Sequence, residues 1–337
     1  MCGPTLDGMT ARRPDLAAVA AGITVVLWAL AFVAVRSAGE AFSPGALAFG
    51  RLAVAVPALA VILVIARGRR ARPVSGAAPG GDALRRTGRL RGRGLALVIV
   101  YGVAWFGAYT VALNWAEQHL DAGTAALLVN FAPIIVAVVA GLFLGEGFSR
   151  RLVVGIAIAF GGVVLITVGG GGAHADTLGV VLGLTAAVLY AAGVLLQKLA
   201  LHRVDAVTAT FWGAVAGLVA TLPFAPAAIA EVAAAPAGDI ATVIFLGVGP
   251  TAIAFTTWAY ALARTNAGAM AATTLVVPAI VIVLSWLILH EVPTPLRIVG
   301  GVLCLTGVAL TRGLIPGPVR LRRGVGRRRA VAAEMSP

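Results

Sequence analysis

The chain has 337 residues, of which 60% are hydrophobic and 12% are charged, and its mean hydropathy is +0.99. A soluble domain carries about 25% charged residues, so this composition excludes an ordinary soluble protein and predicts several membrane crossings. The net charge of +13 does not indicate nucleic-acid binding, because the basic residues flank apolar runs without interleaved aromatic residues. Cys2 and Cys304 stand far apart in different surroundings, so we expect neither a disulfide nor a metal site.

Ten apolar runs are each long enough for a transmembrane helix, which needs about 20 residues. Helices are expected because lipid offers no partner to unpaired backbone groups. The first five predicted spans are 16–36, 44–66, 94–114, 121–143 and 151–169. The second five are 177–198, 206–227, 239–261, 267–289 and 294–312. We therefore predict an all-α integral membrane protein with ten transmembrane helices.

Charge divides the connecting segments into two sets. If both termini are cytoplasmic, the cytoplasmic segments hold 23 of the 26 basic residues, nine of them between Arg67 and Arg93. The opposite segments hold seven acidic residues, including Glu117 and Glu291. The positive-inside rule produces this asymmetry. We therefore expect a multi-pass plasma-membrane protein with both termini in the cytoplasm.

One motif occurs twice in the chain. Its first copy runs from Ala122-Gly123-Thr124-Ala125-Ala126 to Pro133, Gly145-Glu146, Gly155 and Gly162. Its second copy runs from Ala267-Gly268-Ala269-Met270-Ala271 to Pro278, His290-Glu291, Gly300 and Gly307. Every residue of the second copy stands 145 positions after its counterpart. Because each half holds five spans, an odd number, the second half must enter the membrane upside down, which is the inverted-repeat architecture of many transporters.

These residues resemble the EamA domain of the drug/metabolite transporter superfamily. Trp28, Tyr190 and the Ser43-Pro44 pair followed by Arg51 extend the resemblance, which covers about 16–313. It implies a first EamA repeat at 16–169 and a second at 177–313. These are flanked by an N-terminal tail at 1–15 and a basic tail at 314–337, both cytoplasmic. It also implies export or exchange of small metabolites, such as amino acids or drug-like solutes, within a lipid bilayer and without a cofactor.

The predicted function is therefore a secondary transporter working by alternating access, and not an enzyme. An intramembrane enzyme is the first alternative, but all four histidines lie at loops or span ends and no acid pair occurs in mid-span. A channel is the second alternative, but no polar ring or filter is visible. Since no Asp or Glu lies in mid-span, the sequence predicts neither energy coupling nor direction, and it leaves substrate identity and oligomeric state open.

Pro133 and Pro278 fall at corresponding mid-span positions. A proline inside a helix removes one backbone hydrogen bond and kinks the helix, and the freed carbonyl groups can line a cavity. Polar residues precede both prolines by about one turn: Asn130 in the first copy, and Thr273 and Thr274 in the second. This pattern predicts either a substrate path with a hinge near the membrane midplane or a packing kink alone.

Arg51 is the one charge well inside a predicted span. A charged side chain in the bilayer costs about 2.5–3.5 kcal/mol on insertion scales, so it indicates a functional site unless it reaches the interface. We therefore expect Arg51 either to face an anionic group of the substrate or to extend to the outer surface. Further candidates for the substrate path are the aromatic residues Trp28, Trp105, Tyr109 and Trp258.

Glu146 and Glu291 each end a predicted span. A carboxylate at a helix C-terminus is opposed by the helix dipole, so we expect each to have a local partner. The simplest partners are Arg150 or Arg151 for Glu146, and Arg297 for Glu291. The two glutamates are predicted either to hold the turns in place or to act as gates, and a substrate or proton role is the third possibility.

The predicted topology can be tested by labelling cysteines in intact cells. With Cys2 replaced by serine, Gln118→Cys should react with a membrane-impermeant maleimide and Ser75→Cys should not, because position 75 lies in the predicted cytoplasmic segment. Both positions should react after the cells are permeabilised. Labelling of position 75 but not of position 118 in intact cells would show that the predicted orientation is reversed.

Overall fold

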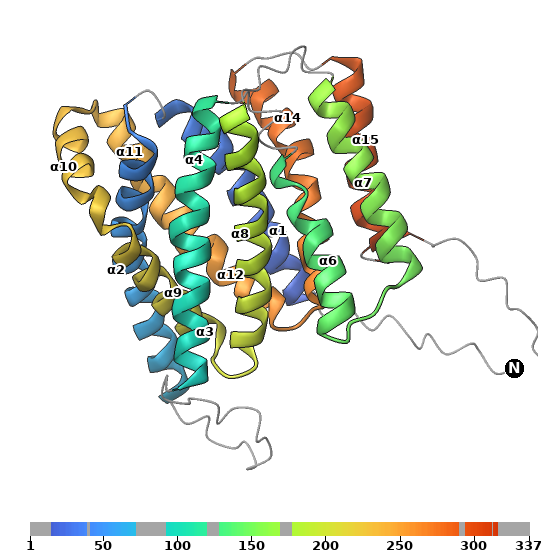
Figure 1. Cartoon of the computed structure of the whole chain (residues 1–337), viewed down its shortest axis with the longest axis horizontal. Helices are drawn as coiled ribbons and strands as arrows, with labels where there is room; N and C mark the ends of the chain where they lie inside the picture. Colours follow the sequence, from blue (N-terminus) through green and yellow to red (C-terminus); the bar gives the residue numbers. More distant parts are fainter. Residues whose placement is uncertain are drawn as a thin grey trace, which may run out of the picture.

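The computed structural model describes residues 15–38, 41–71, 92–119, 128–168, 177–289, 294–311 and 313–315. The regular elements within these ranges are all helical and form one bundle (Figure 1). Among the described residues, five helices or joined helices are long and apolar enough to cross a membrane, and a pair of helices bent by 53° is a sixth candidate. Three shorter apolar helices accompany them. The protein is therefore an all-helical, multi-pass membrane protein.

The first half begins with two long helices, α1 (Leu16–Ala38) and α2 (Pro44–Ala71). The next crossing joins three segments: α3 (Arg93–Tyr101), the π-helical η2 (Gly102–Tyr109) and α4 (Thr110–His119). This helix continues five residues beyond the predicted span 94–114. The first half ends with α6 (Ala132–Phe143) and α7 (Arg150–Val168).

The second half begins with α8 (Thr177–Leu201) and the bent pair, in which α9 (Ala206–Ala220) is followed by η3 (Leu222–Phe224) and α10 (Ala225–Ala234). One joined helix consists of α11 (Ala237–Leu246), the π-helical η4 (Gly247–Ile253) and α12 (Ala254–Leu262). Another consists of α13 (Ala267–Ala272), the 3₁₀ segment η5 (Thr273–Val276) and α14 (Val277–Leu289). The last helix is α15 (Pro295–Thr311).

Acidic side chains fix the beginnings of two helices. Asp205 Oδ1 accepts a hydrogen bond from the Thr208 amide at 3.2 Å and caps α9. Glu231 Oε2 accepts one from the Ser43 amide at 2.8 Å, immediately before α2. Both bonds satisfy amide groups for which a helix N-terminus has no internal partner. Because Glu231 lies on α10, its bond also fixes α10 against the start of α2.

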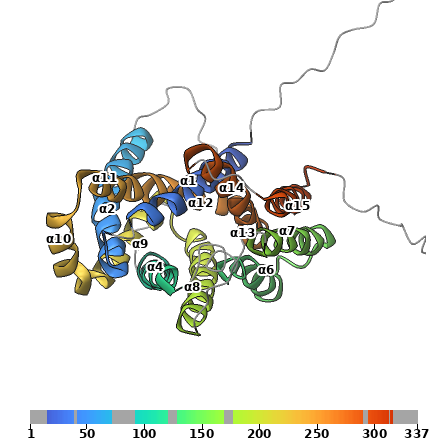
Figure 2. The same ribbon diagram turned by 90° about the horizontal axis from the view of Figure 1, so that it is seen from above.

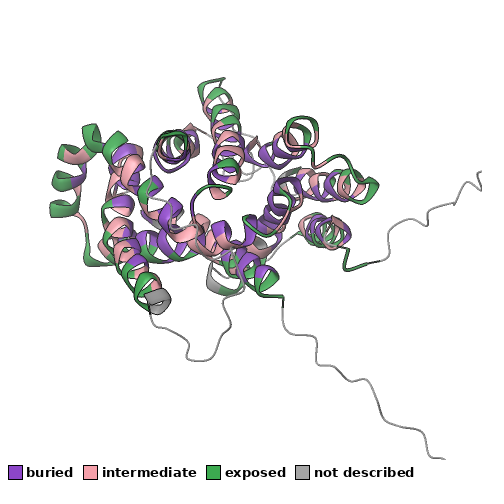
Figure 3. Ribbon diagram, turned by 90° about the horizontal axis from the view of Figure 1, so that it is seen from below, coloured by how far each residue is buried: buried purple, intermediate pink, exposed green. Residues whose placement is uncertain are grey.

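Helices of one half pack against helices of the other. In both views α10 lies at one end of the bundle and the α7–α15 pair at the other (Figures 1 and 2). Between these ends, α1 contacts α12 and α14, and α8, the first helix of the second half, contacts α4 and α6. Exposed residues gather on the outer faces and buried ones between the helices (Figure 3). Corresponding helices of the two halves therefore make corresponding contacts.

The α7–α15 pair is antiparallel and approaches to backbone distance. A Cβ atom added to Gly162 would lie 2.5 Å from the Gly300 carbonyl oxygen, and one added to Gly155 would lie 2.7 Å from that of Gly307. In the repeated motif, Gly300 is the counterpart of Gly155 and Gly307 is the counterpart of Gly162. The contact is therefore reciprocal, since each helix contributes the same two positions. Glycine at these positions permits the close approach of the two backbones.

Two more features recur at the spacing of 145 residues. The Cys304 thiol donates to the Ala159 carbonyl oxygen at 3.3 Å, and these two residues are counterparts midway along the same helix pair. The π-helical segments also correspond, because η2 begins at Gly102 and η4 at Gly247. The repeat seen in the sequence therefore extends to local backbone geometry.

Overpacking the reciprocal contact should destabilise the protein. In Gly307→Ala, the new methyl group would lie 2.5 Å from both the Ala159 nitrogen and the Gly155 oxygen, neither of which can move independently of its helix. We expect a loss of about 1–3 kcal/mol, measured as a lower thermal midpoint in detergent. Gly161→Ala is the matched control, because its methyl group would meet no atom within 4 Å and alanine favours a helix. Equal midpoints for the two variants would contradict the contact.

Candidate functional site

Pro250 in η4 organises a chain of hydrogen bonds at the middle of the bundle. In a regular α-helix the amide of residue 250 would bond to the Leu246 carbonyl oxygen, but proline has no N–H group. The Thr251 hydroxyl donates to that oxygen instead, at 2.7 Å. The Pro250 carbonyl oxygen accepts a bond from Trp28 Nε1 at 3.2 Å. The irregular backbone of the second half therefore binds a side chain of the first half.

Arg51 uses the same irregular segment. It lies about two turns into α2, is half-buried, and donates from Nε to Thr251 Oγ1 at 3.0 Å. Among the residues that the structure describes, the Arg51 side chain forms no other hydrogen bond. Its terminal Nη atoms are therefore unpaired there, and they are not among the buried atoms that lack a partner. A cation held within the bundle with accessible donors is suited to bind an anionic group.

Two polar residues of the η2–α4 helix accompany Arg51. Tyr109 ends η2, Glu117 lies in the last turn of α4, and both interact electrostatically with Arg51. Asn114 Nδ2 donates to the Pro44 carbonyl oxygen at 3.0 Å and fixes α4 against the first turn of α2. Glu117 was expected in an outer connecting segment, but α4 continues past it and leaves it half-buried. It is the charged residue of this site that the sequence analysis missed.

The four predicted aromatic residues form one cluster, with Trp28 at its centre. Its ring centroid lies 5.0 Å from that of Trp258 and 6.3 Å from that of Trp105. Tyr109 joins the cluster through Tyr190, at 5.6 Å between centroids. Trp28 and Tyr109 are partly accessible, whereas Trp105 and Trp258 are fully buried. Two rings can therefore contact a solute, and two others support them from behind.

Pro133 and Pro278 are buried, but neither interrupts a continuous α-helix. Pro133 occupies the first turn of α6, and Pro278 occupies the first turn of α14. First-turn amides have no partner within their own helix, so proline is readily accommodated there. The expected kinks are therefore breaks between two helical segments, at corresponding places in the two halves.

The predicted polar residues lie at these breaks. Asn130 is buried at the break before α6. Thr273 and Thr274 lie in η5, and their hydroxyls donate to carbonyl oxygens of α13 at 3.0 and 2.8 Å. The Thr274 side chain also lies beside the Tyr190 hydroxyl. The break in the second half therefore borders the aromatic cluster.

Glu146 and Lys198 hold the turn between α12 and α13 from two sides. The Glu146 carboxylate accepts bonds from the Ala267 amide at 2.7 Å and the Gly268 amide at 3.2 Å, at the start of α13. Lys198 Nζ donates to the carbonyl oxygens of Leu262 at 2.8 Å and Thr265 at 2.5 Å, at the end of α12. Each charged side chain therefore lies at the helix end that carries a partial charge of opposite sign, which is a stabilising arrangement.

The expected partner of Glu146 was wrong. Within the part of the chain that the structure describes, Glu146 forms no ion pair with Arg150 or Arg151 and binds backbone amides of the second half instead. The amide partners lie 121 and 122 positions later in the chain, so neighbouring arginines could not indicate them. Glu291 lies outside the described residues.

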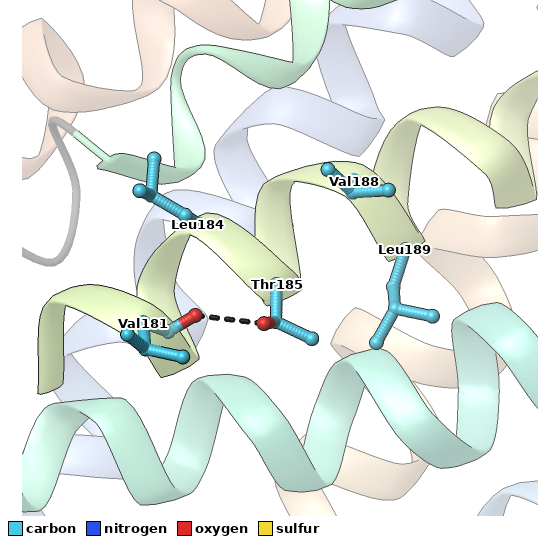
Figure 4. A pocket seen from close by; sticks show the side chains of 5 residues that line it. All are labelled: Val181, Leu184, Thr185, Val188 and Leu189. Atoms are coloured by element: carbon cyan, nitrogen blue, oxygen red, sulfur yellow. Dashed lines mark hydrogen bonds between the residues drawn. The ribbon is translucent and has the colours of Figure 1, made fainter. Parts of the chain in front are cut away.

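A groove on the exposed face of α8 is lined by four aliphatic residues and one threonine (Figure 4). The Thr185 hydroxyl donates to the Val181 carbonyl oxygen at 2.7 Å, which leaves the groove without a free side-chain donor. Such a surface suits a lipid acyl chain and not a polar solute. Among the described residues, no three His, Cys, Asp or Glu side chains gather as metal ligands.

The model of the EamA-like transporter family matches residues 15–168 and 177–313, and so covers both halves. The chain belongs to this family. As an EamA-like transporter it moves solutes across a membrane and is not an enzyme. The match agrees with the resemblance noted in the sequence.

Curated relatives of this EamA-like transporter are themselves named transporters. A probable terminal-alkyne amino-acid exporter of Streptantibioticus cattleyicolor is 36% identical over 91% of this chain and 94% of its own length. A probable amino-acid metabolite efflux pump of Escherichia coli is 27% identical over 64% of this chain and 75% of its own. A crystal structure with a TM-score of 0.67 and 18% identity covers 88% of this chain and 96% of its own, which shows a shared fold.

Glu146→Gln should lower stability more than transport. The amide side chain has one acceptor oxygen where the carboxylate has two, so one bond to α13 is lost and the other loses its charge. We expect a loss of about 1–3 kcal/mol in the free energy of unfolding, with near-normal transport per folded molecule. Asp239→Asn is the control, because Asp239 also lies in the first turn of a helix but its side chain forms no hydrogen bond with any residue that the structure describes. A stable Glu146→Gln protein that binds substrate without moving it would instead indicate a gate.

Proposed function

We propose that this transporter exports small amino-acid metabolites from the cytoplasm by alternating access. The observation that carries the proposal is the accessible Arg51 guanidinium, held within the bundle by Thr251 of the other half. Its free donors suit the carboxylate that every amino acid carries. The names of the relatives from Streptantibioticus cattleyicolor and Escherichia coli, an amino-acid exporter and an amino-acid metabolite efflux pump, support the same substrate class.

The proposed architecture is ten transmembrane helices in two inverted five-helix repeats, 16–169 and 177–313, between cytoplasmic tails 1–15 and 314–337. The reciprocal glycine contact of α7 with α15 supports it, because antiparallel counterparts that exchange the same positions follow from an approximate two-fold axis. The basic segments support cytoplasmic termini in the plasma membrane.

The proposed substrate site lies where the two halves meet. Arg51 would bind the carboxylate, and the accessible rings of Trp28 and Tyr109 would contact the apolar part of the substrate, with Trp105 and Trp258 behind them. A carboxylate bound to Arg51 would also be close to Thr251, so a shift between the halves would alter the site. That coupling of site geometry to domain movement is what alternating access requires.

The helix breaks are proposed to permit this movement. Pro133 and Pro278 each begin a helical segment, so the backbone hydrogen bonds on either side of the breaks form separate units. Asn130, Thr273 and Thr274 lie at these breaks and would border the substrate path. We propose that Glu146 stabilises a turn and does not gate the path, and the same role is proposed for Glu291 on the sequence repeat alone.

Counterflow in proteoliposomes tests the proposed function. The purified protein should exchange labelled apolar L-amino acids and should not exchange labelled nucleosides. Arg51→Gln should weaken apparent affinity at least about tenfold, because charge-assisted bonds to the carboxylate are lost. The apparent affinity of Arg51→Lys should lie between those of the wild type and Arg51→Gln, because lysine keeps the charge but not the planar set of donors. Arg203→Gln, which changes an exposed arginine outside the site, is the control. Exchange of nucleosides alone, or full activity in Arg51→Gln, would contradict the proposal.

A further inference from the structure

Glu117 lies in an unfavourable position for a carboxylate that has no partner. It is in the last turn of α4, where the helix dipole opposes a negative charge, and it is half-buried in a membrane protein. Among the residues that the structure describes, it forms neither a hydrogen bond nor an ion pair. Its side chain is half-buried and so is partly accessible. A carboxylate kept in such a place without a bond is available to a ligand.

Arg51 stands in the complementary situation. It interacts electrostatically with Glu117 and with Tyr109, yet the arginine and the glutamate do not approach to ion-pair distance. The one hydrogen bond of the guanidinium among the described residues is to Thr251, which is uncharged. Two opposite charges therefore lie on helices that pack against each other, α2 and α4, without forming a pair.

Contacts elsewhere on the same helices fix the two segments that carry these charges. Asn114, three residues before Glu117, donates to the Pro44 carbonyl oxygen at 3.0 Å and fixes the end of α4 against the start of α2. On α2, the bond from Arg51 to Thr251 holds the guanidinium toward η4. Side chains of opposite charge form strong hydrogen bonds when they meet. Here the guanidinium is held by Thr251, and the Glu117 side chain has no partner among the described residues.

We infer that Glu117 binds the ammonium group of the substrate while Arg51 binds its carboxylate. The inference rests on the proposed function and narrows it to zwitterionic amino acids with a free amino group. Each substrate charge then faces a protein charge of opposite sign, so the substrate loses water without leaving a charge unpaired. Tyr109, which interacts electrostatically with both Arg51 and Glu117, connects this charged end to the aromatic cluster.

The inference makes Glu117 a specificity-determining residue. An N-acylated amino acid keeps the carboxylate and the side chain but lacks the positive charge. Such an analogue would leave the Glu117 carboxylate desolvated and unpaired, and the site should reject it. A site that relied on Arg51 and the aromatic rings alone would accept both compounds almost equally.

Competition in the counterflow assay tests this inference. The competitors are L-leucine, or whichever apolar L-amino acid the wild-type protein exchanges, and its N-acetyl derivative. Wild-type protein should bind the N-acetyl compound at least about tenfold more weakly. In Glu117→Gln, affinity for the amino acid should fall at least about tenfold while that for the N-acetyl compound does not fall, so discrimination is lost. Asp239→Asn, a change of an acidic residue outside the site, should retain wild-type discrimination.

The possible outcomes separate the inference from the function on which it rests. If wild-type protein exchanges neither compound, the proposed function fails. If it exchanges the amino acid but Glu117→Gln weakens both compounds equally, Glu117 has only a structural role and the inference is wrong. Should Glu117→Gln not fold, Glu117→Asp replaces it, because it keeps the charge and shortens the side chain by one methylene group. The inference then requires a larger loss of affinity for the amino acid than for its N-acetyl derivative.

Discussion

The two halves of this protein approach each other at backbone distance, and the candidate site depends on that approach. A Cβ atom on Gly247, the first residue of η4, would lie 2.8 Å from the Arg51 carbonyl oxygen, so only glycine lets α2 pack this closely. The close packing brings the Arg51 side chain within bonding distance of Thr251. In lipid, where hydrophobic burial does not drive helices together, small residues at such contacts permit the van der Waals packing that does.

The polar groups that hold Trp28 and Arg51 in place occur where regular α-helix gives way to the irregular segment η4. Elsewhere threonines satisfy their own helices, as Thr306 does by donating to the Val302 carbonyl oxygen at 2.7 Å. At η4, Pro250 removes one amide, Thr251 compensates, and the remaining bonding capacity goes to Trp28 and Arg51. A membrane interior tolerates irregular backbone only where other protein groups complete its hydrogen bonds, so irregularity and site coincide.

The sequence predicted the helical membrane class and the repeat, and it singled out Arg51 as a candidate, because apolar length and intramembrane charge are local properties. It missed Glu117, since hydropathy falls near residue 115 although the helix continues to His119, where packing against α2 and α8 supports it. The proline pair was found, but the sequence could not distinguish a kinked helix from two consecutive ones. The partner of Glu146 could not be predicted from the sequence, because it depends on how the second half packs against the first.

The reciprocal contact of α7 with α15 has a consequence for the origin of the chain. An interface in which Gly155 meets Gly307 and Gly162 meets Gly300 is isologous, since both surfaces present the same residues. Two separate copies of a single five-helix unit, inserted in opposite directions, could form that interface with no covalent link. The segment joining the halves then adds effective concentration, fixes a ratio of one to one, and leaves each copy free to diverge, as Cys304 has from Ala159.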